Sequence, residues 1–155
     1  MAFETIIFSV TDGVARLTLN RPDRLNSFTE QMHAEVRAAF AQLAQDKSAR
    51  VFVLSGAGRG FCAGQDLADR SVLPGEAPVD LGASVENNYK PLVLALQNLP
   101  MPTLCAVNGV AAGAGANLAL ACDLVIASRS ASFIQSFSKI GLIPDTGGTY
   151  VLPQR

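Results

Sequence analysis

Three short, mainly apolar runs that are rich in β-branched residues constrain the fold of this chain more than any other feature. They are Val51–Leu54, Thr103–Val107 and Leu124–Ala127. A continuous apolar run of this length is typical of a strand that is buried on both faces of a parallel sheet. Helical patterns separate these runs, so strands and helices alternate. We therefore predict an α/β fold with right-handed crossovers.

Apolar periodicity predicts the elements around these strands. Two runs, Ile6–Val10 and Val14–Asn20, flank an Asp-Gly turn and predict a hairpin. Apolar residues recur at helical spacing up to about Gln45, and again over Leu81–Leu99 despite a proline inside that stretch. A further helix is expected at Gly115–Ala121. No linker divides the 155 residues, which we treat as one unit.

Finer features of the first helix and of one loop can also be predicted. Ser27 followed by Glu30 matches a capping box, so we expect Ser27 to cap the first helix. His33, the only histidine, lies one position off the apolar face and is expected to be solvated. Proline and glycine in Ser71–Val79 predict a surface loop.

Composition excludes several classes of protein. Apolar residues make up 49% of the chain, the net charge is −1, and no basic cluster indicates a nucleic-acid partner. Cys62, Cys105 and Cys122 form no metal-binding or C-x-x-C pattern, so we expect buried, reduced thiols in a cytoplasmic protein. Polar residues interrupt the apolar stretch Thr103–Ala127, which argues against a membrane span.

Familiar catalytic motifs are absent from the sequence. The glycines at Gly56–Gly60 follow a strand, but their spacing does not fit the dinucleotide-binding G-x-G-x-x-G pattern. There is no P-loop, no cluster with zinc spacing and no G-x-S-x-G elbow for a serine hydrolase. We therefore expect no metal and no tightly bound cofactor.

Two segments of small residues are the strongest functional candidates. They are Phe61–Asp66 and Asn108–Asn117, and each follows an apolar run and precedes a predicted helix. A ligand can approach a backbone without bulky side chains closely. Two such loops could therefore offer main-chain N–H groups to one developing oxyanion. Alternatively, the small residues only let a helix pack closely on a sheet.

These segments, taken with others in the same order, resemble the crotonase, or enoyl-CoA hydratase/isomerase, family. The resemblance covers essentially the whole chain. It implies a spiral of ββα units, in which residues 1–155 form the acyl-CoA-binding core without the usual C-terminal helical region. It also implies a homotrimer or a dimer of trimers for the full-length protein. The matching segments are Leu19–Pro22, Leu25–Ser27, Gly60–Asp66, Ala106–Gly109, Gly113–Leu118, Cys122–Asp123 and Gly141–Thr149.

The resemblance implies that the ligand is an acyl-CoA thioester, with coenzyme A arriving as part of the substrate. The backbone N–H groups of Ala63 and Ala114 are the implied oxyanion-hole donors. Arg24 is a candidate phosphate partner, although it could equally be an ordinary surface arginine. The implied coenzyme A contacts are Arg24, Leu25, Ala63, Gly64, Gln65, Asp66 and Leu67.

The resemblance also indicates the type of reaction. Family hydratases carry glutamates at the positions of Asn117 and Phe137, and neither residue here has a carboxyl group. Family isomerases carry a catalytic aspartate at the position of Asp145, where burial would raise the pKa toward neutrality and suit proton transfer. The alternative role for Asp145 is to cap the Thr-Gly-Gly turn that follows it. Asp66 is expected to cap a helix and Asp123 to be structural.

Within the family the chain looks most like the isomerases of phenylacetate degradation, which act on ring-1,2-epoxyphenylacetyl-CoA. The expected reaction is therefore opening of the ring epoxide to the seven-membered oxepin. One alternative is a Δ3,Δ2-enoyl-CoA isomerase or a hydratase of fatty-acid oxidation. Another is an incomplete, non-catalytic acyl-CoA-binding fragment. The acyl pocket is expected between the Leu67–Tyr89 region and Phe133–Ile143.

Overall fold

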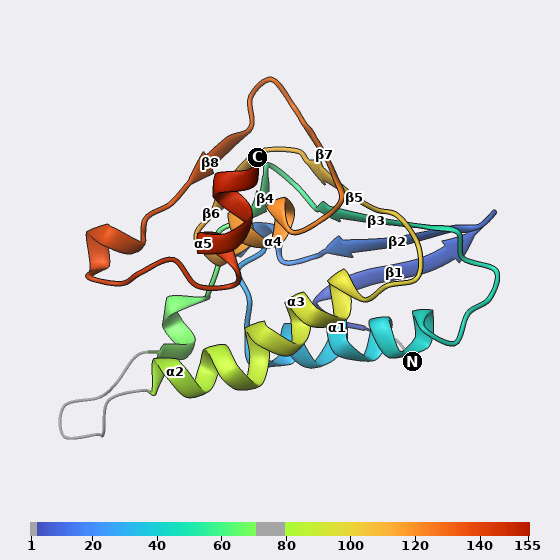
Figure 1. Cartoon of the computed structure of the whole chain (residues 1–155), viewed down its shortest axis with the longest axis horizontal. Coiled ribbons are helices and arrows are strands. Elements are labelled where there is room, and N and C mark those ends of the chain that lie inside the picture. Colours follow the sequence, from blue (N-terminus) through green and yellow to red (C-terminus); the bar gives the residue numbers. More distant parts are fainter. Residues whose placement is uncertain (1–2, 71–79) are drawn as a thin grey trace.

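Two sheets with helices packed against them form the structure, a computed structural model that describes residues 3–70 and 80–155 (Figure 1). The large sheet has the order β1-β2-β3-β5-β7, and the small sheet has the order β4-β6-β8. Among the described strands, β1 and β2 alone pair antiparallel, while the other neighbours are parallel. The strands are β1 (Ile6–Thr11), β2 (Val14–Leu19), β3 (Val51–Gly56), β4 (Gly60–Cys62), β5 (Thr103–Val107), β6 (Val110–Ala112), β7 (Leu124–Ala127) and β8 (Ser132–Ile134).

The strands alternate between the two sheets from β3 onward. β3, β5 and β7 join the large sheet, whereas β4, β6 and β8, each following one of them, join the small sheet. Helical segments follow each of these pairs, so the repeating unit is strand, strand, helix. The α/β class and the ββα arrangement are thus confirmed. The expected hairpin is confirmed as well, and it turns at Asp12 and Gly13, both with positive φ.

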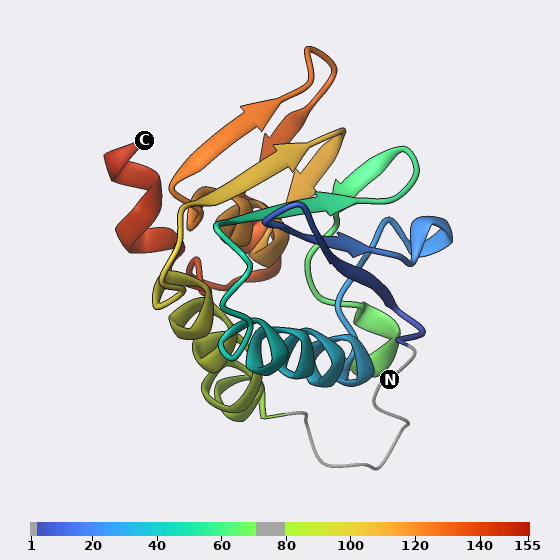
Figure 2. The same ribbon diagram turned by 90° about the vertical axis from the view of Figure 1, so that its right-hand side faces the viewer.

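Helices cover the large sheet and connect it to the small one. α1 and α3 lie side by side against one face of the large sheet, and α4 lies between the strands of the two sheets (Figures 1 and 2). Their apolar residues meet the inward side chains of β2 and β3 in one core. The helices are α1 (Glu30–Leu43), α2 (Leu81–Ser84), α3 (Lys90–Gln97), α4 (Ala114–Leu120) and α5 (Gly148–Val151).

The helix predicted for Leu81–Leu99 contains a π-helical turn. α2 and α3 are joined by the π-helical segment η3 (Val85–Tyr89), and the Lys90 N–H donates to Val85 O. Pro91 follows directly and lacks the N–H that a regular α-helix would use there. The wider turn therefore occurs where the regular hydrogen-bond ladder is already interrupted.

Two predictions about α1 are wrong. His33 is 1% exposed, because its ring packs 4.7 Å from Phe28 and 4.5 Å from Tyr89, measured between ring centroids. The π-helical segment that carries Tyr89 packs on α1 and buries a wider face of it than the spacing of apolar residues within α1 indicates. The N-cap is Thr29, whose Oγ1 accepts from the Met32 N–H at 3.2 Å, and Ser27 bonds elsewhere. Ser71–Val79 lies outside the described residues.

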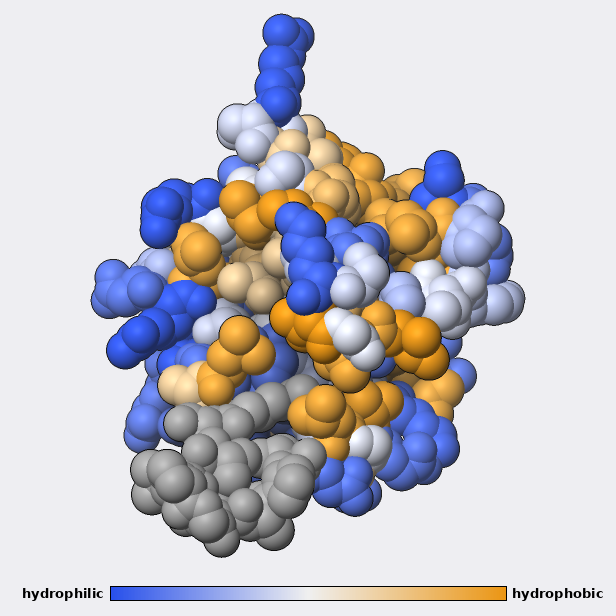
Figure 3. All heavy atoms as spheres, turned by 90° about the vertical axis from the view of Figure 1, so that its left-hand side faces the viewer, coloured by the Kyte–Doolittle hydropathy of each residue, from blue (hydrophilic) through white to orange (hydrophobic). Residues whose placement is uncertain are grey.

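Large apolar side chains are exposed at the outer strands of both sheets. In β7, the outermost strand of the large sheet, Leu124 is 59% and Ile126 is 61% exposed. Phe133 and Ile134 of β8 are about two-fifths exposed. Figure 3 shows apolar side chains gathered among polar ones on the face at the left of Figure 1. Over residues 3–70 and 80–155, no helix has the length and apolarity to span a membrane.

Candidate functional site

The two small-residue segments meet in the structure, and glycine makes the contact possible. A Cβ on Gly64, whose φ is +89°, would lie 2.9 Å from Ala112 O and 3.4 Å from Ala114 N. A Cβ on Gly115 would lie 2.5 Å from Cys62 O. Such distances leave no room for a side chain, so the loop after β4 lies directly on the first turn of α4. Close packing of α4 is therefore confirmed, whereas the oxyanion hole stays a prediction.

The Ala63 N–H is already engaged within the chain. It donates to Leu25 O at 2.9 Å, so it would have to give up this bond to serve a substrate oxygen. A buried carbonyl that loses its donor costs about 1–3 kcal/mol. The expectation that Ala63 is an oxyanion donor stays a prediction, and in this arrangement of the loop it requires Leu25 O to lose its donor.

The neighbouring Gln65 presents its N–H in a suitable direction. Phe28 N–H donates to Gly64 O at 2.7 Å, and Asp66 N–H donates to Phe28 O at 2.9 Å. In such a parallel bridge, the backbone N–H of Gln65 points away from Phe28. Among the described residues it makes no backbone hydrogen bond, nor does that of Ala114, which opens α4. Gln65 and Ala114 are thus the donors that the loop leaves available.

Gln65 is also held through its side chain. Its Nε2 donates to Phe28 O at 3.0 Å, and the Tyr89 hydroxyl donates to its Oε1 at 2.9 Å. Tyr89 is 1% exposed and comes from the π-helical turn. The sequence placed Gln65 among the coenzyme A contacts only. The sequence signal for a donor at this position is Gly64. A glycine readily adopts the positive φ that turns the N–H of the next residue, Gln65, away from Phe28.

A network on the other side of the loop fixes Asp66. The Arg21 guanidinium lies 2.9 Å from Asp66 Oδ2, and the Ser27 hydroxyl donates to the same oxygen at 3.2 Å. The Ala68 N–H donates to Asp66 Oδ1 at 3.1 Å, as expected of a residue that caps η2 (Leu67–Arg70). Burial raises the pKa of Asp66, but these hydrogen bonds and the Arg21 charge outweigh it and hold the pKa below its ordinary value.

The segments expected to contact coenzyme A lie next to each other. Leu25 accepts the Ala63 N–H, which joins the Arg24–Leu25 turn to the loop after β4. Arg24, at the end of the 3-10 helix η1 (Pro22–Arg24), is exposed, and Leu67 is 70% exposed. The structure therefore places the Arg24–Leu25 turn against the loop after β4, with Arg24 and Leu67 accessible. Their role in binding coenzyme A stays a prediction.

Asp145 is tied to α4 through its backbone rather than its carboxylate. Its carbonyl oxygen accepts from the Gly148 N–H and from Asn117 Nδ2, both at 2.8 Å. Among the described residues, the carboxylate accepts one bond, from the Thr146 hydroxyl to Oδ1 at 2.8 Å. The Gly147-Gly148 turn is thus closed by the Asp145 carbonyl, and the carboxylate does not cap it. Asp145 is half-buried, where full burial was expected.

Thr146 holds this turn in an unusual backbone conformation. Its φ is +53°, in the left-handed region that a β-branched residue rarely adopts, and its side chain is 4% exposed. Such a conformation costs about 1–3 kcal/mol and persists only where the surroundings enforce it. The buried surroundings of Thr146 therefore fix the backbone conformation of the turn that carries Asp145.

The positions at which a hydratase would carry acids have other roles here. Asn117 is fully buried, and Gln135 Nε2 donates to its Oδ1 at 2.7 Å. Phe137 is 7% exposed, and its ring end lies 3.7 Å from where a Cβ on Gly113 would be. Asp123 accepts from the Thr103 N–H and hydroxyl, which confirms its structural role. Asp145 is joined to the first turn of α4 through its backbone carbonyl, which accepts from Asn117 Nδ2.

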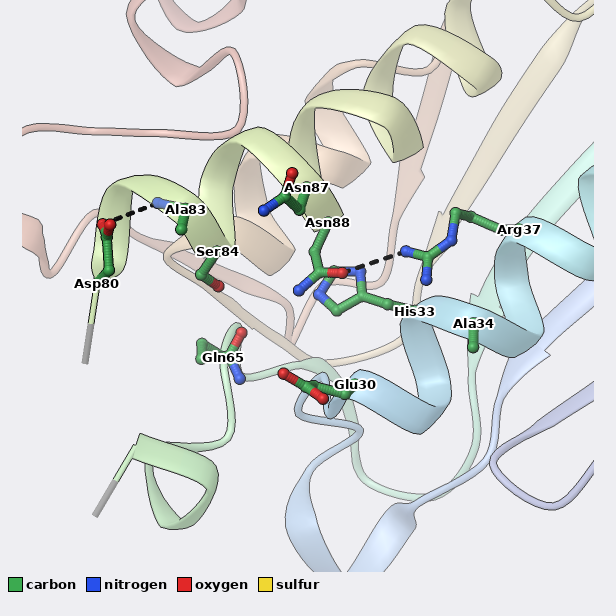
Figure 4. A pocket seen from close by; sticks show the side chains of 10 residues that line it. All are labelled: Glu30, His33, Ala34, Arg37, Gln65, Asp80, Ala83, Ser84, Asn87 and Asn88. Atoms are coloured by element: carbon green, nitrogen blue, oxygen red, sulfur yellow. Dashed lines mark hydrogen bonds between the residues drawn. The ribbon is translucent and has the colours of Figure 1, made fainter. Parts of the chain in front are cut away.

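A pocket of about 470 Å³ lies beside Gln65, between α1 and the α2–η3 segment (Figure 4). It includes part of the Leu67–Tyr89 region expected to line the acyl pocket. A second, mainly apolar pocket of about 250 Å³ between α3 and α5 reaches Thr146 and Gly147. The first is lined by Glu30, His33, Ala34, Arg37, Gln65, Asp80, Ala83, Ser84, Asn87 and Asn88.

The three cysteines are buried and free, as the sequence predicts. Cys62 lies under the candidate site, where its thiol donates to Asn26 O at 3.2 Å and accepts from the Gly64 N–H at 3.4 Å. Burial raises the pKa of Cys62 to about 12, although the Gly64 hydrogen bond lowers it slightly. This thiol therefore stays protonated at neutral pH.

Comparison with known proteins gives consistent matches. Residues 9–155 match the family model described as enoyl-CoA hydratase/isomerase. The chain is 60% identical to the 1,2-epoxyphenylacetyl-CoA isomerase of Escherichia coli K12, over 97% of this chain and 58% of that protein. It is 45% identical to a protein of Rhodobacter capsulatus named a probable enoyl-CoA hydratase, over 100% of this chain and 58% of that protein.

Solved structures match as well. The crystal structure of an enoyl-CoA hydratase from Bacillus anthracis superposes with a TM-score of 0.87 at 33% identity, over 97% of this chain and 58% of that chain. The chain thus spans a little under three-fifths of the length of these relatives.

Proposed function

Because the chain belongs to the enoyl-CoA hydratase/isomerase family, we propose that it acts on an acyl-CoA thioester and isomerises the acyl group. The observation that carries the proposal is the contact made through Gly64 and Gly115. This contact brings the Gln65 loop onto the turn that contains Ala114 and Asn117. The Gln65 loop and the first turn of α4 then each supply one main-chain N–H donor, and the turn at Asp145 supplies a carboxylate.

The proposed chemistry uses the protein's own groups in two steps. The Asp145 carboxylate takes a proton from a carbon that is acidified by the thioester carbonyl, and negative charge moves onto the carbonyl oxygen. The N–H groups of Gln65 and Ala114 donate to that oxygen, each contributing about 3 kcal/mol by analogy with other oxyanion holes. The Asp145 carboxyl group then returns the proton to another atom, so substrate and product have the same composition.

For the substrate, we propose ring-1,2-epoxyphenylacetyl-CoA, with the oxepin as product. The bond between the two epoxide carbons breaks, which expands the ring to seven members, and the proton taken beside the carbonyl returns to a ring carbon. The 60% identity to the E. coli 1,2-epoxyphenylacetyl-CoA isomerase supports this choice. Phe137, at a position near Gly113 where a hydratase would carry an acid, is compatible with a flat, ring-bearing acyl group. Coenzyme A would lie along Arg24–Leu25 and Ala63–Leu67, with Arg24 available to a phosphate. We also propose that the protein is cytoplasmic and forms a homotrimer or a dimer of trimers.

Hydration is the second candidate, because relatives named enoyl-CoA hydratase match the chain. Hydration needs groups that activate and deliver water. At the two positions in question, Asn117 is occupied with Gln135 and Asp145, and Phe137 cannot transfer a proton. This side-chain chemistry favours isomerisation.

The test compares three substrates with the wild type and Asp145→Asn. We expect isomerisation of ring-1,2-epoxyphenylacetyl-CoA, weaker isomerisation of a β,γ-enoyl-CoA, and little hydration of crotonyl-CoA. Asp145→Asn should lower isomerisation by about 10²- to 10⁴-fold, and the Asn117 bond to the backbone carbonyl should keep the turn intact. Hydration as fast as isomerisation, or a fully active Asp145→Asn, would refute the proposal.

A non-catalytic acyl-CoA-binding fragment is a candidate of another class. It is motivated by coverage, because the chain spans 58% of the length of the E. coli and R. capsulatus relatives. Intact mass and calorimetric binding of phenylacetyl-CoA separate the two possibilities. A mass of 16.2 kDa with binding but no turnover would favour the fragment.

A further inference from the structure

The buried amide of Asn117 links three segments of the chain. It belongs to α4, its Oδ1 accepts from Gln135 Nε2 at 2.7 Å, and its Nδ2 donates to Asp145 O at 2.8 Å. A Cβ on Gly148 would lie 2.2 Å from Asn117 Nδ2, so the Gly147-Gly148 turn rests directly on this amide. Asn117 therefore supports the backbone that carries the Asp145 carboxylate.

The orientation of the amide follows from its partners. A backbone carbonyl can only accept, so Asn117 must present Nδ2 to Asp145 and Oδ1 to Gln135. Gln135 must then donate its amino group, and its own Oε1 is left buried and without a hydrogen-bond partner among the described residues. A buried acceptor without a partner has an energetic cost. The hydrogen bonds from Gln135 to Asn117 and from Asn117 to Asp145 are therefore kept despite that cost.

The turn that this amide supports is strained and has one free oxygen. Thr146 is held at a φ of +53° and donates its hydroxyl to Asp145 Oδ1. Within the described residues, Asp145 Oδ2 has no hydrogen-bond partner, and the proposed function takes it as the oxygen that receives the proton. Backbone strain of this kind needs continuous support from the surroundings. The Asn117 amide and the Gly148 N–H supply it at the Asp145 carbonyl.

We propose that Asn117, oriented by Gln135, is a positioning residue that aims the Asp145 carboxylate by holding the Asp145 backbone carbonyl. The inference rests on the proposed role of Asp145 as the proton carrier. Since both ends of its amide are engaged within the chain, Asn117 acts through Asp145 and takes no part in the proton transfer itself. It thus fills, with a neutral amide, the position at which a hydratase would carry a reacting acid.

The experiment measures kcat and KM for isomerisation by the whole chain. Asn117→Ala should lower kcat about 10- to 100-fold, since small displacements of a catalytic group have effects of this size. KM should change by less than about 2-fold, because acyl-CoA contacts are untouched. Gln135→Met, which removes only the donor to Asn117, should give a smaller loss and keeps the test valid if Asn117→Ala folds poorly. Asn98→Ala, an exposed amide at the end of α3, is the matched control.

A double-mutant cycle separates positioning from general damage to the structure. In the Asp145→Asn background, Asn117→Ala should change the residual rate by less than about 2-fold, since its effect passes through the Asp145 carboxylate. An equal loss in both backgrounds would overturn the inference. So would an unchanged kcat in Asn117→Ala while Asp145→Asn is inactive.

Amide hydrogen exchange gives a readout that does not depend on activity. The Gly148 N–H donates to the carbonyl that Asn117 holds, so it should exchange faster in Asn117→Ala and unchanged in Asn98→Ala. Unchanged exchange at Gly148 in Asn117→Ala would overturn the inference whatever the activity. An Asp145→Asn variant as active as the wild type would instead refute the proposed function.

Discussion

Gly64 shows how one residue without a side chain sets the geometry of the candidate site. Its φ of +89° turns the loop so that the Gln65 N–H faces away from Phe28. Its missing Cβ lets the same loop lie against Ala112 and Ala114. The position of one main-chain donor relative to the other therefore depends on this glycine.

Gly64→Ala should destabilise the chain and reduce isomerisation strongly. The new Cβ would lie 2.9 Å from Ala112 O, a backbone atom, in addition to the strain of a positive φ. Gly141→Ala is the matched control, because Gly141 also has a positive φ (+70°) but a Cβ there meets nothing within 4 Å. We expect Gly141→Ala to cost about 1 kcal/mol and Gly64→Ala at least about 2 kcal/mol more in urea unfolding. Equal costs would show that the loop does not lie against Ala112.

The buried thiol of Cys62 predicts how stability depends on alkaline pH. Its pKa is raised by burial from about 9 to about 12. Above pH 9 the unfolded chain loses this proton while the folded chain keeps it, so folding stability should fall as pH rises from 9 toward 12. Cys62→Ala should remove part of that slope in urea unfolding and leave the remaining slope to other groups. An identical slope in Cys62→Ala would contradict the assignment.

At the scale of elements, the start of α1 shows which of two hydroxyl side chains caps the helix, which the sequence alone assigns to the wrong one. Thr29 caps the helix through the Met32 N–H, whereas Ser27 bonds to Asp66. We expect Thr29→Ala to cost about 1 kcal/mol and to speed exchange of the Met32 amide. Ser27→Ala, as the control, should leave that amide protected. Faster exchange of the Met32 amide in Ser27→Ala would return the capping role to Ser27.

The same scale explains which elements could be predicted. The long strands of the large sheet and the helical stretches carry enough residues for a pattern, and they were predicted within a few positions. β4, β6 and β8 have three residues each and show no periodicity, so only the family resemblance implied them. The burial of His33 depends on α3 and η3, which lie far along the chain.

For the candidate site, local sequence indicated the segments that meet but not the hydrogen bond that engages the Ala63 N–H. The small residues around Gly64 and Gly115 predicted a close approach, and the structure confirms it. The engagement of the Ala63 N–H depends on Leu25, which is 38 positions away, so no local pattern could indicate it. The link between Asn117 and Asp145 is likewise a tertiary contact.

On the scale of the whole molecule, the apolar outer strands predict association. Leu124 and Ile126 expose more than half of their surface on β7, and an exposed apolar edge invites pairing with another chain. Ile126→Lys should reduce light scattering of concentrated samples and leave acyl-CoA binding unchanged. Arg16→Lys on β2, which keeps the charge of an exposed position, serves as the control. Scattering that does not respond to Ile126→Lys would assign association to another surface.

The central claim is that Asp145 moves a proton on a thioester whose enolate is held by main-chain N–H groups. Proton exchange at the carbon beside the carbonyl tests this most directly. The protein is incubated with phenylacetyl-CoA in deuterium oxide, and loss of the proton signal beside the carbonyl is followed by NMR. We predict enzyme-dependent exchange that falls at least about 100-fold in Asp145→Asn. Bound phenylacetyl-CoA without exchange in the wild type, or equal exchange in Asp145→Asn, would contradict the claim.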